Sequence, residues 1–152
     1  MSQLPKQLNE YSNKSLMDGY LKLFDENQRK EYSKILETYY QWAGGIPFAI
    51  TAFADILVWN DNYVYKYNLL DDEVSVILSG FDYFFQNLED KEYQKDYFEL
   101  DLYEKCKQKV GELCFDECFV FSPIPALGGA KDSDTVSKGK SLEYVALLIQ
   151  FC

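Results

Sequence analysis

The chain has 152 residues, of which 47% are hydrophobic and 17% aromatic, and its formal net charge is −10. This composition excludes a disordered chain and predicts one domain with an aromatic-rich core. The negative charge disfavours direct contact with nucleic acid, whose phosphates it would repel, and the longest apolar-leaning run, residues 44–59, is too short to span a membrane.

The N-terminal part predicts a surface arm followed by a short strand. Residues 1–14 are polar and aperiodic, and their only apolar anchors are Leu4, Leu8 and Tyr11. Residues 19–24 gather apolar side chains over a few positions, which suits a strand.

A helix is predicted over residues 26–41. Asp25 with Gln28 three positions later resembles a capping box, and the apolar side chains that follow recur on one helix face. Gly44-Gly45 then ends the periodic pattern, as glycine commonly does after a helix.

The middle of the chain predicts an antiparallel meander. Residues 46–53 are expected to form an apolar connector rather than a strand. Two β-rich runs, residues 55–59 and 63–68, are separated by the turn-forming sequence Asn60-Asp61-Asn62, and residues 73–78 supply a third strand.

Helices dominate the following part of the chain. Apolar side chains recur at helical spacing in residues 81–88, 93–100 and 102–110, with charged residues on the outer sides. The overall expectation is an α+β fold, in which an antiparallel meander packs with several amphipathic helices in a single domain.

The C-terminal part combines a strand, a turn, a loop and a closing helix. Residues 118–129 join an apolar strand to a proline-stiffened turn and Gly128-Gly129. Residues 131–140 are expected to be a polar loop, and Ser141 is expected to be the N-cap of an apolar helix that runs to the end of the chain and packs on the sheet.

The sequence shows no catalytic constellation. It has no histidine, which removes Ser-His-Asp and Cys-His arrangements. The pairs Asp71-Asp72 and Asp116-Glu117 could hold a metal or transfer protons, but adjacent acids in turns are usually solvated loop residues. We therefore predict a protein that is not an enzyme, with no catalytic residues, and keep a carboxylate or metal enzyme as a minor alternative.

The cysteines do not predict a cofactor or a metal site. Cys106, Cys114 and Cys118 lack the paired Cys-x2-Cys spacing of zinc knuckles, although a three-cysteine site with Cys152 is conceivable. No secretory leader pattern is seen, so reduced thiols and a cytoplasmic location are expected. The glycines at 128–129 lack the spacing of phosphate-binding loops and are interpreted as a backbone reversal.

Several segments together carry a family resemblance. They are Phe53-Ala54-Asp55 with Trp59, Leu102-Tyr103, Val110-Gly111, the run from Asp116 to Phe121, Pro125 to Gly129, and the closing run from Leu142 to Leu148. The chain resembles the immunity proteins paired with type VI secretion DNase effectors. It departs from their pattern at Ala54, where glycine is expected, and at Tyr144, where histidine is usual.

The resemblance implies a domain organisation and a function. Within one α+β domain over residues 1–152, residues 1–45 would form a GAD-like N-terminal region and residues 46–152 a C-terminal immunity region. The protein would bind a cognate toxin, most often a nuclease, and occlude its basic active surface. No cofactor, metal, nucleic acid or membrane is implied, and the oligomeric state stays open.

A contact surface for that toxin is predicted between residues 81 and 104, where eight acidic residues stand against two lysines. An acidic surface would be attracted to a basic nuclease, and exposed tyrosines are common anchors at interfaces. The alternatives are that the acids only maintain solubility and that the tyrosines belong to the core. The predicted contact residues are Asp82, Tyr83, Glu89, Asp90, Glu92, Tyr93, Asp96, Tyr97, Glu99 and Asp101.

The same features fit a second function, a protein-interaction or regulatory module that has no toxin partner. An isolated gene would favour this alternative, whereas a neighbouring gene for a large secreted protein with a C-terminal toxin domain would favour immunity.

Overall fold

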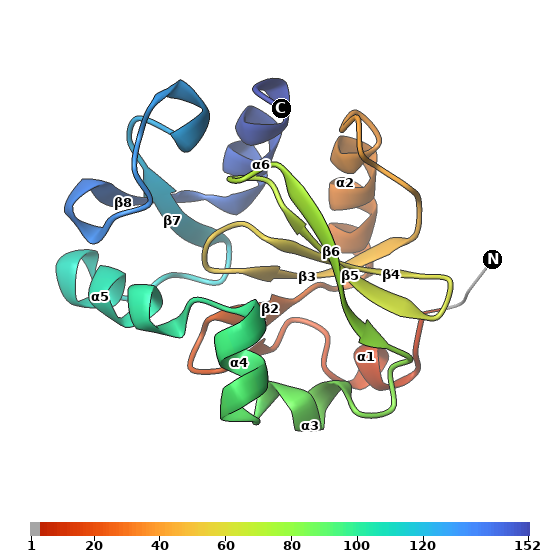
Figure 1. Ribbon diagram of the computed structural model, residues 1–152. Coiled ribbons are helices and arrows are strands. Elements are labelled where there is room, and N and C mark those ends of the chain that lie inside the picture. Colours follow the sequence, from red (N-terminus) through yellow and green to blue (C-terminus); the bar gives the residue numbers. More distant parts are fainter. Residues whose placement is uncertain (1–3) are drawn as a thin grey trace.

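The computed structural model describes residues 4–152 and contains two antiparallel sheets (Figure 1). The main sheet is a six-stranded meander whose strands lie side by side in chain order. Its strands are β1 (Ser15–Leu16), β2 (Leu21–Leu23), β3 (Ile46–Thr51), β4 (Ile56–Asn60), β5 (Tyr63–Asn68) and β6 (Glu73–Ser79). The second sheet pairs β7 (Glu117–Phe121) with β8 (Val136–Lys140).

Helices lie on both sides of the main sheet, with α2 and α6 on one side and α3 and α4 on the other (Figure 1). The α+β expectation is therefore confirmed. The helices are α1 (Gln7–Glu10), α2 (Glu26–Leu36), α3 (Phe84–Leu88), α4 (Lys91–Tyr97), α5 (Leu100–Val110) and α6 (Ser141–Gln150), with 3-10 turns η1 (Pro125–Leu127) and η2 (Ser133–Thr135).

The N-terminal segment is more ordered than an aperiodic arm. The first three residues of the predicted arm lie outside the described part, but the remainder contains α1. Leu8 is buried in the core, and the ring of Tyr11 packs 4.6 Å from that of Phe85. Two of the expected anchors therefore attach this segment to the protein.

The expectation of a connector over residues 46–53 is wrong, because this segment contains strand β3. Five of its six residues are buried, so its two faces carry similar apolar side chains and the usual alternation is missing. β3 pairs with β2 on one side and β4 on the other, so one sheet crosses the predicted boundary between residues 45 and 46. The division into two regions stays a prediction.

The predicted helix over residues 26–41 begins correctly and ends early. The capping box is present, with Gln28 N donating to Asp25 Oδ1 at 2.8 Å and Asp25 N donating to Gln28 Oε1 at 3.0 Å. The helix ends at Leu36. Tyr39 lies in a turn beyond the helix, where its ring packs against that of Tyr67. It fits the apolar pattern of the helix because it is buried, and not because the helix continues.

The expectation of a polar loop over residues 131–140 is also wrong, because β8 occupies its second half. β8 pairs with only one strand, and Ser137, Lys138 and Lys140 are exposed along it. An edge strand with a solvated face carries too few apolar residues to be distinguished from a loop by sequence pattern.

The two sheets meet at an aromatic contact that we call the seam, formed by Tyr20, Phe53, Tyr103, Phe119 and Phe121. The ring of Phe53 lies 6.1 Å from Tyr20, 5.9 Å from Phe119 and 5.8 Å from Phe121. Phe119 N also donates to Ala52 O at 2.8 Å. The seam therefore joins the turn between β3 and β4 to strand β7.

Two departures from the family pattern have structural explanations. Ala54 adopts a left-handed backbone with φ +64°, a conformation that favours glycine, and the turn forms nonetheless. Tyr144 lies in the core, where its hydroxyl accepts a hydrogen bond from Phe121 N at 3.5 Å. It therefore packs α6 against β7.

Candidate functional site

The predicted contact residues flank α3, lie on α4 and reach the start of α5, and we call these ten residues the helical surface. Its acidic side chains, at positions 82, 89, 90, 92, 96, 99 and 101, are all exposed. Asp90 caps α4 by accepting a hydrogen bond from Tyr93 N at 3.0 Å. Lys66 Nζ donates to Tyr97 O at 2.6 Å and so fixes the end of α4 to β5.

The tyrosines of the helical surface do not share one environment. Tyr83 is 67% exposed, as expected for an anchor. Tyr93 and Tyr97 are half-buried, and their ring centroids are 4.7 Å apart. Tyr93 donates its hydroxyl to Ile77 O at 2.5 Å, and burial raises the pKa of its phenol. The expectation of three exposed tyrosines is therefore wrong for Tyr93 and Tyr97, which help to pack α4.

Ion pairing reduces the charge at one end of the helical surface. Lys131 Nζ lies 2.5 Å from a Glu99 carboxylate oxygen and 3.5 Å from one of Asp71. Within residues 4–152, the other acids of the surface have no ion pair. Their field is available to attract a basic partner.

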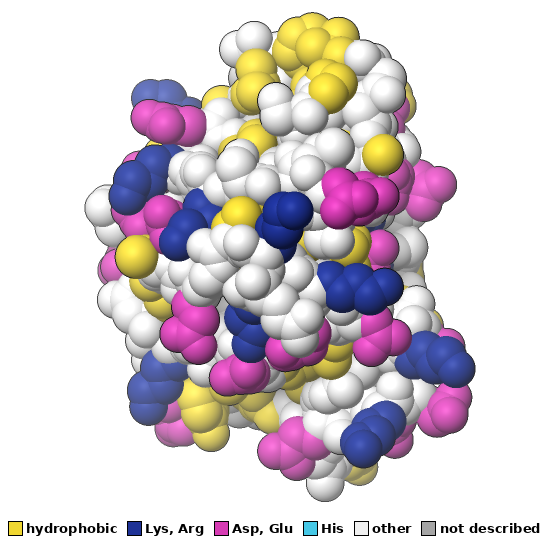
Figure 2. Space-filling view, turned by 90° about the vertical axis from the view of Figure 1, so that its left-hand side faces the viewer, with side chains coloured by type: hydrophobic (Ala, Val, Ile, Leu, Met, Phe, Trp, Pro, Cys, Tyr) yellow, Lys and Arg dark blue, Asp and Glu magenta, His cyan; other side chains and the backbone are white. Residues whose placement is uncertain are grey.

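An open groove of about 520 Å³ runs along α4 and the start of α5. Lys91, Lys95 and Lys105 line it together with Glu99 and Asp101. The neighbouring face around α5 and β8 shows a similar mixture of charges (Figure 2). The helical surface is therefore acidic overall, but it is not a field of one sign.

The carboxylate pairs considered for chemistry have structural partners. Asp72 accepts hydrogen bonds from the hydroxyls of Tyr39 and Tyr40, at 2.5 and 2.6 Å, and these bonds lower its pKa. Asp116 pairs with Lys140 at 2.7 Å, while Glu117 accepts from Cys114 N at 2.7 Å.

The four cysteines are free, and they differ in their exposure to solvent. Cys106 and Cys118 are buried, and burial raises the pKa of both thiols, whereas Cys114 and Cys152 are exposed. Across residues 4–152, no three acidic, cysteine or histidine side chains form a group that could hold a metal ion. Cys118 is fully buried in β7, where its thiol packs as a small apolar side chain.

A buried carboxylate lies beside the seam. Asp55 is 3% exposed; its Oδ2 accepts the hydroxyl of Thr51 at 2.9 Å, and its Oδ1 has no partner within the described part of the chain. Burial raises the pKa of Asp55 to about 6, against the opposing effect of Lys66 and Lys131. The sequence placed Asp55 in the family motif but gave no sign of its burial.

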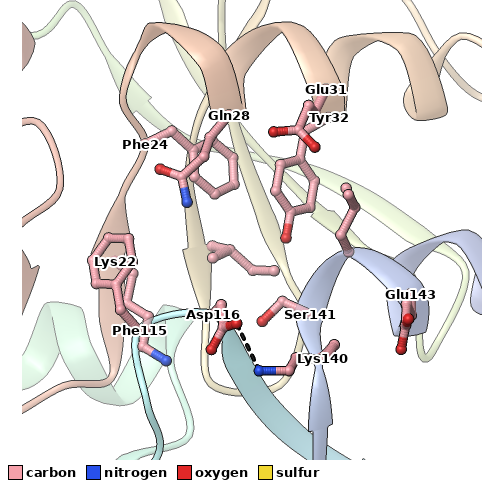
Figure 3. A pocket seen from close by; sticks show the side chains of 12 residues that line it. Lys22, Phe24, Gln28, Glu31, Tyr32, Phe115, Asp116, Lys140, Ser141 and Glu143 are labelled. Atoms are coloured by element: carbon pink, nitrogen blue, oxygen red, sulfur yellow. Dashed lines mark hydrogen bonds and ion pairs between the residues drawn. The ribbon is translucent and has the colours of Figure 1, made fainter.

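A pocket of about 290 Å³ lies where α2, β2 and β3 meet the start of α6 (Figure 3). Gln28 and Tyr32 point from α2 toward Ser141 and the Asp116–Lys140 pair. Lys22 and Ser141, both 3% exposed, are among its lining residues. Neither residue is among the predicted site residues, because a lysine in a short strand and a serine at the start of a helix carry no distinctive sequence pattern.

Ser141 is not the N-cap that the sequence predicts. It is the first residue of α6, the N-cap is Lys140, and no side chain caps this helix. In the described residues the hydroxyl of Ser141 has no hydrogen-bond partner. None of the helices between residues 4 and 152 is long and apolar enough to cross a membrane.

Comparison with known proteins finds a family match in the C-terminal part of the chain. Residues 78–152 match the family described as T6SS immunity protein Tdi1, C-terminal. The match covers just under half of the chain and supports a type VI secretion immunity protein. It includes the whole helical surface and the seam residues Tyr103, Phe119 and Phe121.

A solved structure supports the fold over a longer stretch. The crystal structure of Atu4351 from Agrobacterium tumefaciens is similar with a TM-score of 0.63, at 16% identity, over 90% of this chain and 69% of that chain. At this identity the similarity shows the fold alone. No curated protein matches the chain.

Proposed function

We propose that this protein protects the cell that makes it by binding a cognate secreted nuclease and covering the nuclease's basic active surface. The observation that carries the proposal is the match of residues 78–152 to the Tdi1 C-terminal family, together with the position of the helical surface inside that segment. A non-enzymatic mode of action fits the absence of histidine from the sequence and the structural use of its carboxylate pairs.

Electrostatics supports the choice of partner. The formal net charge is −10, and a nuclease has to present a basic surface to its phosphate substrate. Opposite charges accelerate association, and exposed charges act over a screening length of about 8 to 10 Å near physiological salt. The exposed acids on α4 and on both flanks of α3 would guide the encounter, and Tyr83 would bury its ring on contact.

Co-expression tests the function itself. Where a neighbouring gene encodes a large secreted protein with a C-terminal toxin domain, that domain should arrest growth when expressed alone, and co-expression of this chain should restore growth. Failure of rescue at equal expression would refute the immunity proposal. In that case, capture of a housekeeping protein by the purified chain would favour the interaction module without a toxin partner.

Charge reversal on α4 tests the surface. Glu92→Lys with Asp96→Lys should slow association with the toxin by about tenfold or more at low salt. The matched control, Glu37→Lys with Glu73→Lys, makes the same change in net charge at exposed positions outside the helical surface. Equal association rates for the two variants in stopped-flow measurements would remove α4 from the interface.

A further inference from the structure

The pocket between α2 and the start of α6 contains an unusual combination of buried polar groups. Lys22 Nζ donates to Cys114 O at 2.6 Å and to Glu117 O at 2.7 Å, and no carboxylate pairs with it in the described chain. Burial lowers the pKa of this ammonium group. Lys22 thus supplies a buried positive charge that two carbonyl oxygens bind, and the nearby carboxylates of Glu117 and Asp116 also favour its charged form.

The start of α6 adds donors to the same pocket. Ser141 N donates to Asp116 O at 2.9 Å, and Leu142 and Glu143 follow in the first turn of α6, where main-chain N–H groups have no acceptor within the helix. Both residues line the pocket. Because no side chain caps α6, its positive end is open to an anion.

The hydroxyl of Ser141 is a second and independent indication of a ligand. It is buried in the pocket wall and makes no hydrogen bond of ordinary length in the described part, although it lies close enough to the Tyr32 phenol and the Cys118 thiol to oppose the rise in their pKa on burial. Figure 3 shows the hydroxyl directed into the pocket, with the phenol of Tyr32 pointing toward it from α2. A ligand oxygen placed here would accept hydrogen bonds from donors that the protein leaves unused.

The remaining lining narrows the class of ligand. Phe24, Ile50 and Phe115 contribute apolar surface, which suits a ligand with an apolar body. Asp116 is neutralised by Lys140 at 2.7 Å, whereas Glu31 and Glu143 are exposed carboxylates at the pocket. These two acids disfavour a phosphate dianion more than a singly charged carboxylate.

We propose that this pocket binds an organic carboxylate with an apolar body, with its carboxylate held by Lys22, the Ser141 hydroxyl and the first N–H groups of α6. The site is separate from the helical surface and does not depend on the nuclease partner. Its failure would leave the proposed immunity function untouched.

Titration of the isotope-labelled full chain with benzoate at constant ionic strength tests the proposal. The amide resonances of residues 141–143 should shift and saturate, whereas uncharged benzyl alcohol and inorganic phosphate should produce at least tenfold weaker binding. A peptide that ends in phenylalanine with a free carboxylate distinguishes the source: tighter binding than benzoate would indicate a chain end, and weaker binding a small free acid. Non-saturating shifts with both carboxylates would overturn the proposal.

Two variants locate the binding. Lys22→Met should weaken benzoate binding about tenfold or more, while Lys30→Met, which makes the same change in net charge at an exposed position of α2, should not. Ser141→Ala should weaken binding about threefold with little change in stability, since the hydroxyl makes no hydrogen bond of ordinary length within the described part of the protein. Equal effects of Lys22→Met and Lys30→Met, or unchanged binding by Ser141→Ala, would contradict the assignment.

Discussion

The seam and the helical surface place similar residue types in opposite environments. At the seam, aromatic rings are buried, and Asp55 beside them keeps one oxygen unpartnered. On the helical surface, acids are solvated and Tyr83 is exposed, while Tyr93 and Tyr97 pack against each other. The difference shows that a carboxylate or a tyrosine has no fixed role in this chain until its burial is known.

This contrast separates stability from recognition. A buried group loses its hydration on folding, so changing it alters the free energy of unfolding. An exposed charge interacts weakly with its own protein but acts on an approaching partner. Substitutions at the seam and its adjoining turn should therefore change stability, and those on the helical surface should change association.

The largest effect is expected for Gly129→Ala, in the turn that follows β7. A Cβ at position 129 would clash with the carbonyl oxygen of Pro123, so the backbone would have to move, and we expect a loss of more than about 4 kcal/mol in the free energy of unfolding. Gly128→Ala is the matched control: its Cβ would meet no atom within 4 Å, and only φ +91° opposes it, at a cost of about 1 kcal/mol. Equal unfolding midpoints in urea would show that the close approach is not required.

The next effect concerns Asp55 and pH. Because the folded state raises its pKa from 3.8 to about 6, the unfolded state releases the proton first. Its contribution to stability is fully present below pH 4, falls as pH rises from 4 to 6, and is lost above pH 6, by about 3 kcal/mol in total. Asp55→Asn cannot titrate, so the difference in unfolding free energy between variant and wild type should change by that amount between pH 4 and pH 7. A constant difference would mean that the pKa of Asp55 is the same in the folded and the unfolded state.

The smallest changes in stability are expected for two tyrosines of the helical surface, which should differ from each other. Tyr93→Phe removes the hydroxyl that donates to Ile77 O and should cost about 1 kcal/mol of stability. Tyr83→Phe removes a hydroxyl from an exposed ring and should change stability by less than about 0.5 kcal/mol. Chemical denaturation gives the free energy of unfolding of both variants. A larger loss for Tyr83→Phe than for Tyr93→Phe would contradict the exposed position of Tyr83 and the hydrogen-bonded position of Tyr93.

Local patterns in the sequence were sufficient for several elements. The capping box at Asp25 and Gln28 marked the start of α2, because both of its hydrogen bonds lie within four residues. The turn-forming residues between β4 and β5 predicted their hairpin, and the helical periodicities predicted α3, α4 and α5. These interactions are local, so the residues that make them are close together in the chain.

Sequence patterns were insufficient where partners come from distant parts of the chain. β3 is buried on both faces, and β8 has only one neighbouring strand, so neither shows the alternation of a half-buried strand. The exposure of Tyr93 depends on Ile77 in β6, and the environment of Asp55 depends on Thr51 and the adjoining core.

The sequence by itself determined the α+β class, the acidic charge, the lack of histidine chemistry and the family resemblance, since these follow from composition and short motifs. Only the tertiary structure decided which charges are buried and which polar groups lack partners. Lys22 meets the carbonyls of Cys114 and Glu117 more than ninety positions later, and Ser141 closes the same pocket from the last helix. Burial is a property of packing between distant segments, and it governs both the pKa values and the hydrogen bonds on which these sites depend.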